Sequence, residues 1–148
     1  MPLVSDGHGN LTYRIIGACM AVHNDLGPGH REIVYQRALA RKFDELGIEY
    51  EEFVELVVQD ENGDTLIVYK PDFRIKKCVW LEIKAQSWQL TGDDEAQLID
   101  YFSADILETC NVGLLVNFGR PRLQYERKFP PDNLHEFRRK RWGYKPKE

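Results

Sequence analysis

Cysteine is scarce in this sequence, and its spacing excludes two common ways of stabilising a small domain. Cys19, Cys78 and Cys110 are scattered and odd in number, and no CxxC motif is present. This spacing argues against both a zinc knuckle and a disulfide framework. We therefore expect reduced, mostly buried thiols that behave as small hydrophobic side chains.

Long apolar runs and a secretory signal are also missing. No run approaches the roughly 18 apolar residues that a membrane-spanning helix needs. The first ten residues, MPLVSDGHGN, have no basic start followed by an apolar core, so no signal peptide is expected. From these absences we expect a cytoplasmic protein with no membrane partner.

The remaining composition is that of one globular domain with an uneven charge distribution. The chain has 148 residues, 43% hydrophobic and 30% charged, with a net charge of -4. That net charge argues against strong non-specific binding of nucleic acid. Residues 119–148, however, hold 10 Lys and Arg against 4 Asp and Glu. We expect a domain over residues 1–130 and a basic C-terminal helix or tail over residues 131–148.

The basic tail has two interpretations. Its run RRKRWGYKPK, residues 138–147, mixes cations with Trp142 and Tyr144. Cations bind phosphates and aromatic rings stack on bases, so the run suits a nucleic acid. Charge runs are more often solvated surface, and this second interpretation is the more common outcome.

The hydrophobic pattern predicts helices first and strands afterwards. Apolar residues have helical spacing over residues 11–26 and about 30–46, and Gly47 is expected to end the second helix. One strand is expected over residues 48–60, followed by a hairpin turn at ENGD and a second hairpin formed by PDFRI and CVWLEIKA. A helix from about residue 93, two strands and a short helix near residues 134–141 complete the order. This order predicts an α/β fold with a central mixed β-sheet flanked by helices.

The segment KPDFRIKKCVWLEIKA, residues 70–85, carries the chemistry. Glu82 and Lys84 are two residues apart, so both side chains leave the same face of a strand. Asp72 precedes them on the neighbouring segment. Buried charges are costly unless they are paired or hold something between them. Two carboxylates and a lysine on one face suit Mg²⁺ or Mn²⁺ and an activated water; a half-exposed salt bridge is the alternative.

The turn between the two strands provides a geometric test. A two-residue turn at residues 76–77 would place Asp72 and Glu82 on opposite faces of the hairpin. The metal site therefore requires an odd-length connection or a bulge, such as residue 75 facing residue 79.

Three more polar residues lie on predicted helices. Glu32 is on the second helix, and Gln97 and Tyr101 are four residues apart on the later one, hence on one face. The latter two are placed to contact a phosphate backbone or Lys84, or to mark an ordinary amphipathic boundary.

These residues and the segments around them resemble a known protein family. GHREIVY, residues 29–35, is similar to the signature of the GxxExxY proteins, a bacterial family of the PD-(D/E)XK nuclease superfamily. Nearly the whole chain takes part in the resemblance, through AVHNDLGPGHREIVYQRAL, YKPDFRI, VWLEIKA, EAQLIDY and GLLVNFGRPRLQYERK. The resemblance implies a restriction-endonuclease-like core and, within the superfamily, the RecB-like or lambda-exonuclease-like branch.

The same resemblance implies roles for individual residues. Asp72 and Glu82 correspond to the metal-binding acids, with the carbonyl of Ile83 as a further ligand and Lys84 as the catalytic lysine. Glu32 corresponds to the helical acid that completes the metal site and is counted among the catalytic residues.

Two further positions follow from the same comparison. Gln97 and Tyr101 resemble the QxxxY element that contacts substrate. His23 matches an upstream histidine that some relatives use as a ligand, although a helix-end histidine is more often a capping group.

The function implied is a Mg²⁺- or Mn²⁺-dependent phosphodiesterase acting on DNA, with RNA as a second substrate class. The competing hypothesis is a catalytically silent nuclease fold that binds nucleic acid or protein. A homodimer or a partner protein is expected if so small a nuclease is to hold its substrate.

Overall fold

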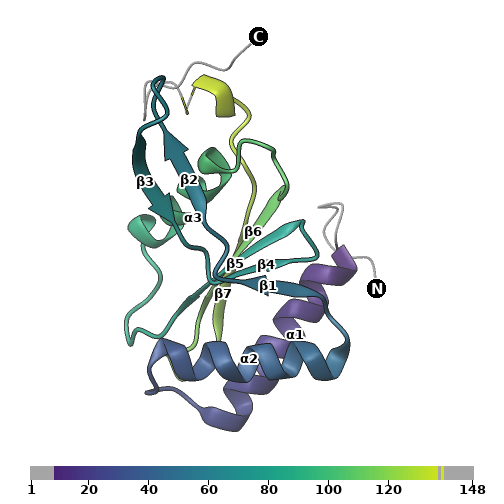
Figure 1. The fold of residues 1–148 in the computed structure, drawn as a ribbon. Helices are drawn as coiled ribbons and strands as arrows, with labels where there is room; N and C mark the ends of the chain where they lie inside the picture. Colours follow the sequence, from purple (N-terminus) through teal and green to yellow (C-terminus); the bar gives the residue numbers. More distant parts are fainter. Residues whose placement is uncertain (1–8, 137, 139–148) are drawn as a thin grey trace.

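The computed structural model describes residues 9–136 and 138 (Figure 1). In chain order the elements are α1 (Gly9–Leu26), α2 (Glu32–Leu46), β1 (Tyr50–Glu52), β2 (Leu56–Gln59), β3 (Thr65–Tyr69), β4 (Phe73–Ile75), β5 (Val79–Lys84), α3 (Gly92–Ala104), β6 (Val112–Asn117) and β7 (Gln124–Lys128).

The central sheet is mixed, as the sequence predicts. Its strand order is β1-β4-β5-β6-β7. Only β5 and β6 run parallel, and the other neighbours are antiparallel. The parallel pair is connected through α3, because parallel strands need a long crossover and a helix supplies it. The α/β class with a mixed sheet flanked by helices is therefore confirmed.

The single strand expected over residues 48–60 is wrong. Residues 50–52 form β1 of the central sheet, whereas residues 56–59 form β2, which pairs only with β3 in a separate two-stranded sheet. Phe53 lies between them with φ 61°. A left-handed residue cannot continue an extended strand, so the chain turns there and leaves the central sheet.

Two hydrophobic clusters cover the two faces of the central sheet. Figure 1 shows α1 and α2 on one side and α3 with the β2–β3 hairpin on the other. Side chains of β5 alternate between these clusters, because successive residues of a strand point to opposite faces. Leu81 and Ile83 pack with α1 and α2, whereas Trp80 packs with α3. Glu82 and Lys84 therefore lie on the α3 face.

The ends of α2 and α3 are fixed by local capping. Gly47 ends α2 with φ 68°, and its N–H donates to the carbonyl of Asp44, which confirms the predicted stop. Thr91 begins α3, where its side chain and that of Asp94 form a reciprocal capping box. This box fixes where α3 starts and therefore which face of the helix carries Gln97 and Tyr101.

The C-terminal segment packs on α3 where it is described. Arg138 is only 2% exposed, and its guanidinium donates to the carbonyls of Phe102, Ser103 and Asp105 at the end of α3. A cation there satisfies carbonyls that have no partner within the helix and complements the helix dipole. Arg138 therefore caps α3 instead of facing a phosphate. Residues 137 and 139–148 of the predicted basic tail lie outside the described residues.

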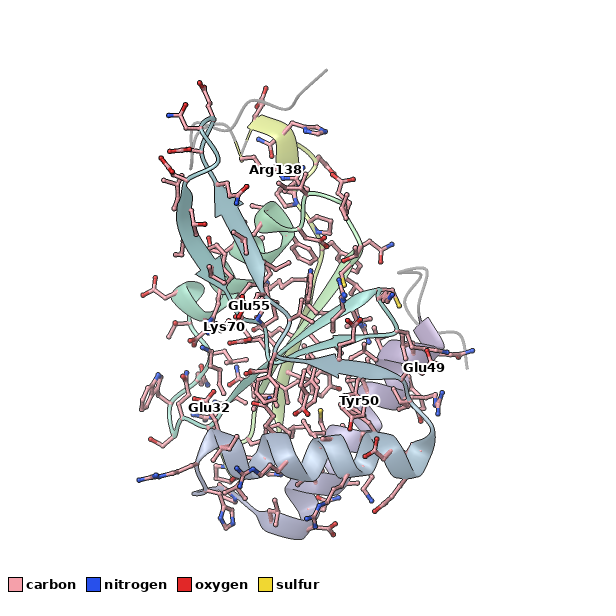
Figure 2. All side chains as sticks on the ribbon, viewed as in Figure 1. Glu32, Glu49, Tyr50, Glu55, Lys70 and Arg138 are labelled. Carbon is pink, nitrogen blue, oxygen red and sulfur yellow. The ribbon has the colours of Figure 1, made fainter. Side chains whose placement is uncertain are left out.

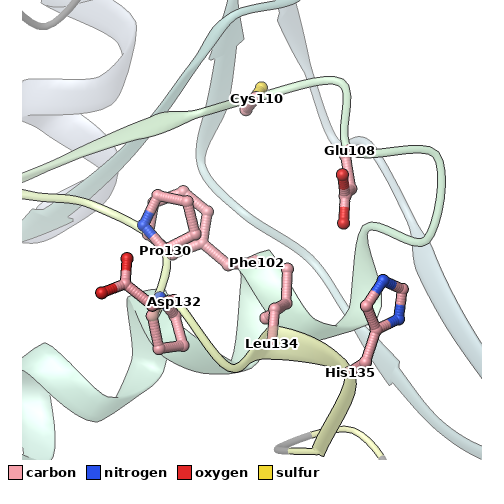
Figure 3. A pocket seen from close by; sticks show the side chains of 8 residues that line it. Phe102, Glu108, Cys110, Pro130, Asp132, Leu134 and His135 are labelled. Carbon is pink, nitrogen blue, oxygen red and sulfur yellow. The ribbon is translucent and has the colours of Figure 1, made fainter.

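A small pocket lies beside this capped end. It has a volume of about 260 Å³, and Figure 3 shows apolar Phe102 and Leu134 with polar Glu108 and His135 around it. None of its lining residues is a candidate site residue, so the chemistry predicted from the sequence lies elsewhere.

Candidate active site

The β4–β5 hairpin has the odd-length connection that the sequence requires. Ile75 pairs with Val79, and Phe73 pairs with Leu81. Residues 76–78 form the connection, in which Lys76 and Lys77 have φ of 50° and 54°. The next position along this register places Asp72 opposite Glu82. Asp72 itself lies just before β4, not within a strand.

Asp72 and Glu82 are tied to each other through the backbone. The N–H of Asp72 donates to Glu82 Oε1 over 3.3 Å, and the N–H of Ile83 donates to Asp72 Oδ2 over 2.7 Å. These two contacts fix the orientation of both carboxylates relative to the strand. The role of the Ile83 carbonyl as a further ligand stays a prediction.

Helix α3 supplies a partner for the acid and one for the lysine. Tyr101, 2% exposed, donates its hydroxyl to Glu82 Oε1 over 2.9 Å. Lys84 Nζ donates to Gln97 Oε1 over 2.6 Å and lies 3.9 Å from Glu82 Oε2. Gln97 therefore reaches the lysine, one of the two contacts that the sequence suggests, and Tyr101 holds the acid. A direct contact of either side chain with substrate stays a prediction.

The electrostatic environment raises the pKa of both acids. Glu82 is 5% exposed, and its burial, followed by repulsion from Asp72, raises its pKa. Burial is also the main reason that the pKa of Asp72 is raised, and the negative charge of Glu32 adds to it. Two neighbouring carboxylates, one buried and one half-buried, favour a shared proton, and a cation would relieve the same repulsion. Their oxygens are the hard ligands that Mg²⁺ and Mn²⁺ prefer.

Glu32 lies at the edge of this group. Figure 2 shows it at the start of α2, and its side chain is exposed. Among residues 9–136 and 138, no group of three or more His, Cys, Asp or Glu side chains would hold a metal. The structure brings together two carboxylates, Asp72 and Glu82, which suits an ion that keeps several waters. The role of Glu32 as a further ligand stays a prediction.

His23 has a partner of its own. It is buried near the end of α1, and its Nε2 donates to the carbonyl of Arg120 over 2.9 Å. This bond joins α1 to the loop between β6 and β7 and gives the imidazole a structural role.

Sequence reasoning missed Asn117, a buried residue at the end of β6. Its Oδ1 accepts from the N–H groups of Gln86 and Gly119, and its Nδ2 donates to the carbonyl of Trp88. A single amide thus holds two loops beside the end of β5. The available signal was a polar residue closing the otherwise apolar strand VGLLVN.

The three cysteines fit the sequence prediction. All are free, with Cys19 and Cys110 buried and Cys78 half-buried. Burial raises the pKa of the Cys110 thiol to about 12, so the protonated and unreactive form predominates.

Comparison with known proteins agrees with this geometry. The family model described as the PD-(D/E)XK nuclease superfamily matches residues 9–128. The chain therefore belongs to the PD-(D/E)XK nuclease superfamily. No curated protein and no solved structure gives a significant match. Within residues 9–136 and 138, no helix is long and apolar enough to span a membrane.

The raised pKa values of the two acids predict a pH-dependent response to a divalent metal. Between about pH 4, where the unfolded carboxyls ionise, and about pH 8, to which the pKa of Glu82 is raised, the folded state binds more protons than the unfolded state. The pair therefore destabilises the metal-free protein increasingly as pH rises. A cation removes this repulsion, so Mn²⁺ should raise Tm by roughly 5 °C at about pH 8 and by less at about pH 5.5.

Thermal unfolding with and without Mn²⁺ at the two pH values checks this prediction. Asp72→Asn is the matched variant, because it keeps the shape of the side chain and removes its charge. We expect this variant to lose most of the gain at the higher pH. An equal gain at both pH values, or an unchanged gain in Asp72→Asn, would place the metal elsewhere.

Proposed function

We propose that the protein is a Mg²⁺- or Mn²⁺-dependent nuclease that hydrolyses phosphodiester bonds of DNA, with RNA as a second substrate class. One observation carries the proposal. The three-residue β4–β5 connection places Asp72 opposite Glu82, and Lys84 follows on the same face. A buried acid, a half-buried acid and a lysine on one face suit metal-assisted phosphodiester hydrolysis. Membership of the nuclease superfamily supports it independently.

Each residue has a role in this proposal. Asp72, Glu82 and the carbonyl of Ile83 would hold the ion, and Glu32 is proposed as a further carboxylate ligand. The bound ion would lower the pKa of a water and stabilise charge on the phosphate. Lys84, steadied by Gln97, orients the attacking water and neutralises the developing negative charge. Tyr101 keeps the carboxylate of Glu82 in place.

Cleavage of end-labelled DNA tests the proposal. Wild type is compared with Asp72→Ala on single- and double-stranded DNA, with Mg²⁺, with Mn²⁺ and with a chelator. Glu61→Ala is the control, because Glu61 is an exposed acid at the tip of the β2–β3 hairpin. We expect wild type and Glu61→Ala to cut DNA when metal is present, and Asp72→Ala not to cut it. Equal cutting by Asp72→Ala would assign the activity to another site or a contaminant.

The alternative function is a silent nuclease fold that acts as an interaction module. The same protein preparations separate the two functions by metal titration. A pure interaction module has no need for a cation, so Mn²⁺ binding that disappears in Asp72→Ala favours the nuclease. Tight binding of nucleic acid without metal binding or cleavage would favour the module.

We also propose that a second copy of the chain pairs along β3. Among the described residues β3 pairs only with β2, and Leu66, Ile67 and Val68 are exposed along it. An uncharged strand edge favours pairing with another strand. If the two β3 strands pair antiparallel with Ile67 at the centre, Asp64 of each copy lies opposite Lys70 of the other, which gives two such charge pairs. Sedimentation should show a dimer that Ile67→Lys dissociates; a wild-type monomer would rule the pairing out.

A further inference from the structure

Trp88 is the largest side chain on the loop that follows the candidate catalytic strand. This loop, residues 85–91, connects Lys84 at the end of β5 to Thr91 at the start of α3. The side chain of Trp88 is 61% exposed. Single exposed hydrophobic residues are common on protein surfaces, so exposure alone assigns no role. A role is indicated instead by the contacts that hold the backbone of this loop.

Asn117 fixes the backbone of the loop that carries Trp88. Its Nδ2 donates to the carbonyl of Trp88 over 3.0 Å, and its Oδ1 accepts from the N–H of Gln86 over 3.1 Å. Gly119 approaches the loop so closely that an added Cβ would lie 2.4 Å from the backbone N and O of Gln86. The loop is thus held by a buried side chain and by tightly packed backbone.

Three further contacts hold the rest of the loop. Before Trp88, Arg120 donates to the carbonyl of Ser87 over 3.1 Å. Gln86 Nε2 donates over 3.0 Å to the Asp94 carboxylate of α3. After it, Gln124 Oε1 of β7 accepts from the N–H of Leu90 over 3.0 Å. The backbone of this surface loop is therefore anchored along its length, while its one tryptophan faces water. A ring presented on a fixed backbone loses little conformational entropy when it binds a ligand.

The position of Trp88 limits what that ligand is. Trp88 follows Lys84 by four residues, so their Cα atoms are at most about 14 Å apart. That distance corresponds to roughly four nucleotides at the rise of about 3.4 Å per base along one strand. The adjoining β6–β7 loop adds positive charge from Arg120, half-buried, and Arg122, exposed. An aromatic face beside cations is the pattern of single-stranded nucleic-acid binding surfaces.

We propose that Trp88 is a stacking platform for an unpaired base of the strand whose phosphate lies at Asp72 and Glu82. The inference rests on the proposed nuclease function and adds a substrate class to it. A base inside a duplex has no free face for the ring, so the platform takes single-stranded or frayed DNA. Trp88 is a positioning residue, because it holds the strand and takes no part in the chemistry.

Binding measured in a cleavage-deficient background tests the platform. The Lys84→Ala protein is combined with Trp88→Ala or Trp88→Phe and titrated with fluorescently labelled single- and double-stranded oligonucleotides in Mg²⁺. Trp88→Ala should raise Kd for single-stranded DNA by about 5- to 150-fold, since stacking on one base accounts for that range. The change for blunt duplex should be less than about twofold, and Trp88→Phe should retain most of the affinity because it keeps a ring.

Leu107→Ala is the matched control. Leu107 is 86% exposed on the loop before β6, after the opposite end of α3, so its removal also deletes an exposed apolar side chain. We expect no change in Kd from it. Trp88→Ala in the otherwise wild-type chain should raise KM for single-stranded DNA and leave kcat unchanged, with an unaltered Tm.

The outcomes separate this inference from the function on which it rests. Cleavage by wild type with equal Kd values for wild type and Trp88→Ala would overturn the platform and leave the nuclease standing. Equal weakening for single strand and duplex would also overturn base stacking. Binding that needs Trp88 without any metal-dependent cleavage would uphold the platform and overturn the nuclease.

Discussion

Replacing Lys84 with alanine is expected to lower the rate of DNA cleavage by about 10²- to 10³-fold at saturating Mg²⁺, the loss typical of removing one preorganised charge-stabilising group. The ammonium of Lys84 lies 3.9 Å from Glu82 and is held by Gln97, so it is already in place before substrate binds. Single-turnover cleavage with excess enzyme measures the effect on the chemical step.

Metal binding distinguishes a chemical role of Lys84 from a structural one. Because the carboxylates remain in Lys84→Ala, this variant should still bind Mn²⁺, and loss of the nearby positive charge should not unfold it. Gln97→Ala should show a smaller loss of rate, since it removes only the partner that steadies the ammonium. Lys42→Ala is the control, because Lys42 is a half-buried lysine on α2 whose ion pair is with Glu45 of the same helix. Wild-type rates in Lys84→Ala would remove Lys84 from the mechanism.

Replacing Gly119 with alanine is expected to destabilise the protein by about 3 kcal/mol or more. An added Cβ would lie 2.4 Å from the backbone N and O of Gln86 and 2.6 Å from the carbonyl carbon of Ala85. Both obstacles are backbone, so no side-chain rotation relieves them. The loop after Lys84 would have to move away from Asn117, which should also lower cleavage. Urea unfolding and the cleavage assay measure the two effects.

Gly17→Ala is the control for a glycine substitution. Gly17 lies inside α1, and an added Cβ there meets nothing within 4 Å. Because alanine favours a helix more than glycine does, this variant should be more stable by up to about 1 kcal/mol. If Gly119→Ala were as stable as wild type, the close approach of the two loops would not constrain the site.

The arrangement of the two acids was partly accessible from the sequence, because it depends on strand periodicity and on the length of the turn between the strands. Glu82 and Lys84 are two residues apart, so they share a face of the strand. Asp72 joins that face if the connection between the two strands has an odd number of residues, which follows from counting along the hairpin. The structure has that register. The stop at Gly47 was accessible for a similar reason, since a left-handed C-terminal position strongly favours glycine.

Other features depended on contacts between distant segments. The strand predicted over residues 48–60 divides at Phe53, a residue type that rarely adopts a left-handed conformation, and β2 then packs on α3. Local pattern favoured one continuous strand, and packing of the hairpin against α3 overrode it. Arg138 belongs to a run that resembles a phosphate-binding tail, yet it is buried as the cap of α3.

For the site, the sequence determined which side chains share a face: Asp72, Glu82 and Lys84 on the hairpin, Gln97 and Tyr101 on α3. Only the tertiary structure decided that Tyr101 holds the acid, that Gln97 holds the lysine, and that Asn117 and Gly119 fix the loop carrying Trp88. The physical reason is the range of the interactions. Backbone periodicity acts between near neighbours in the chain, whereas hydrogen bonds and close packing select partners by their position in space.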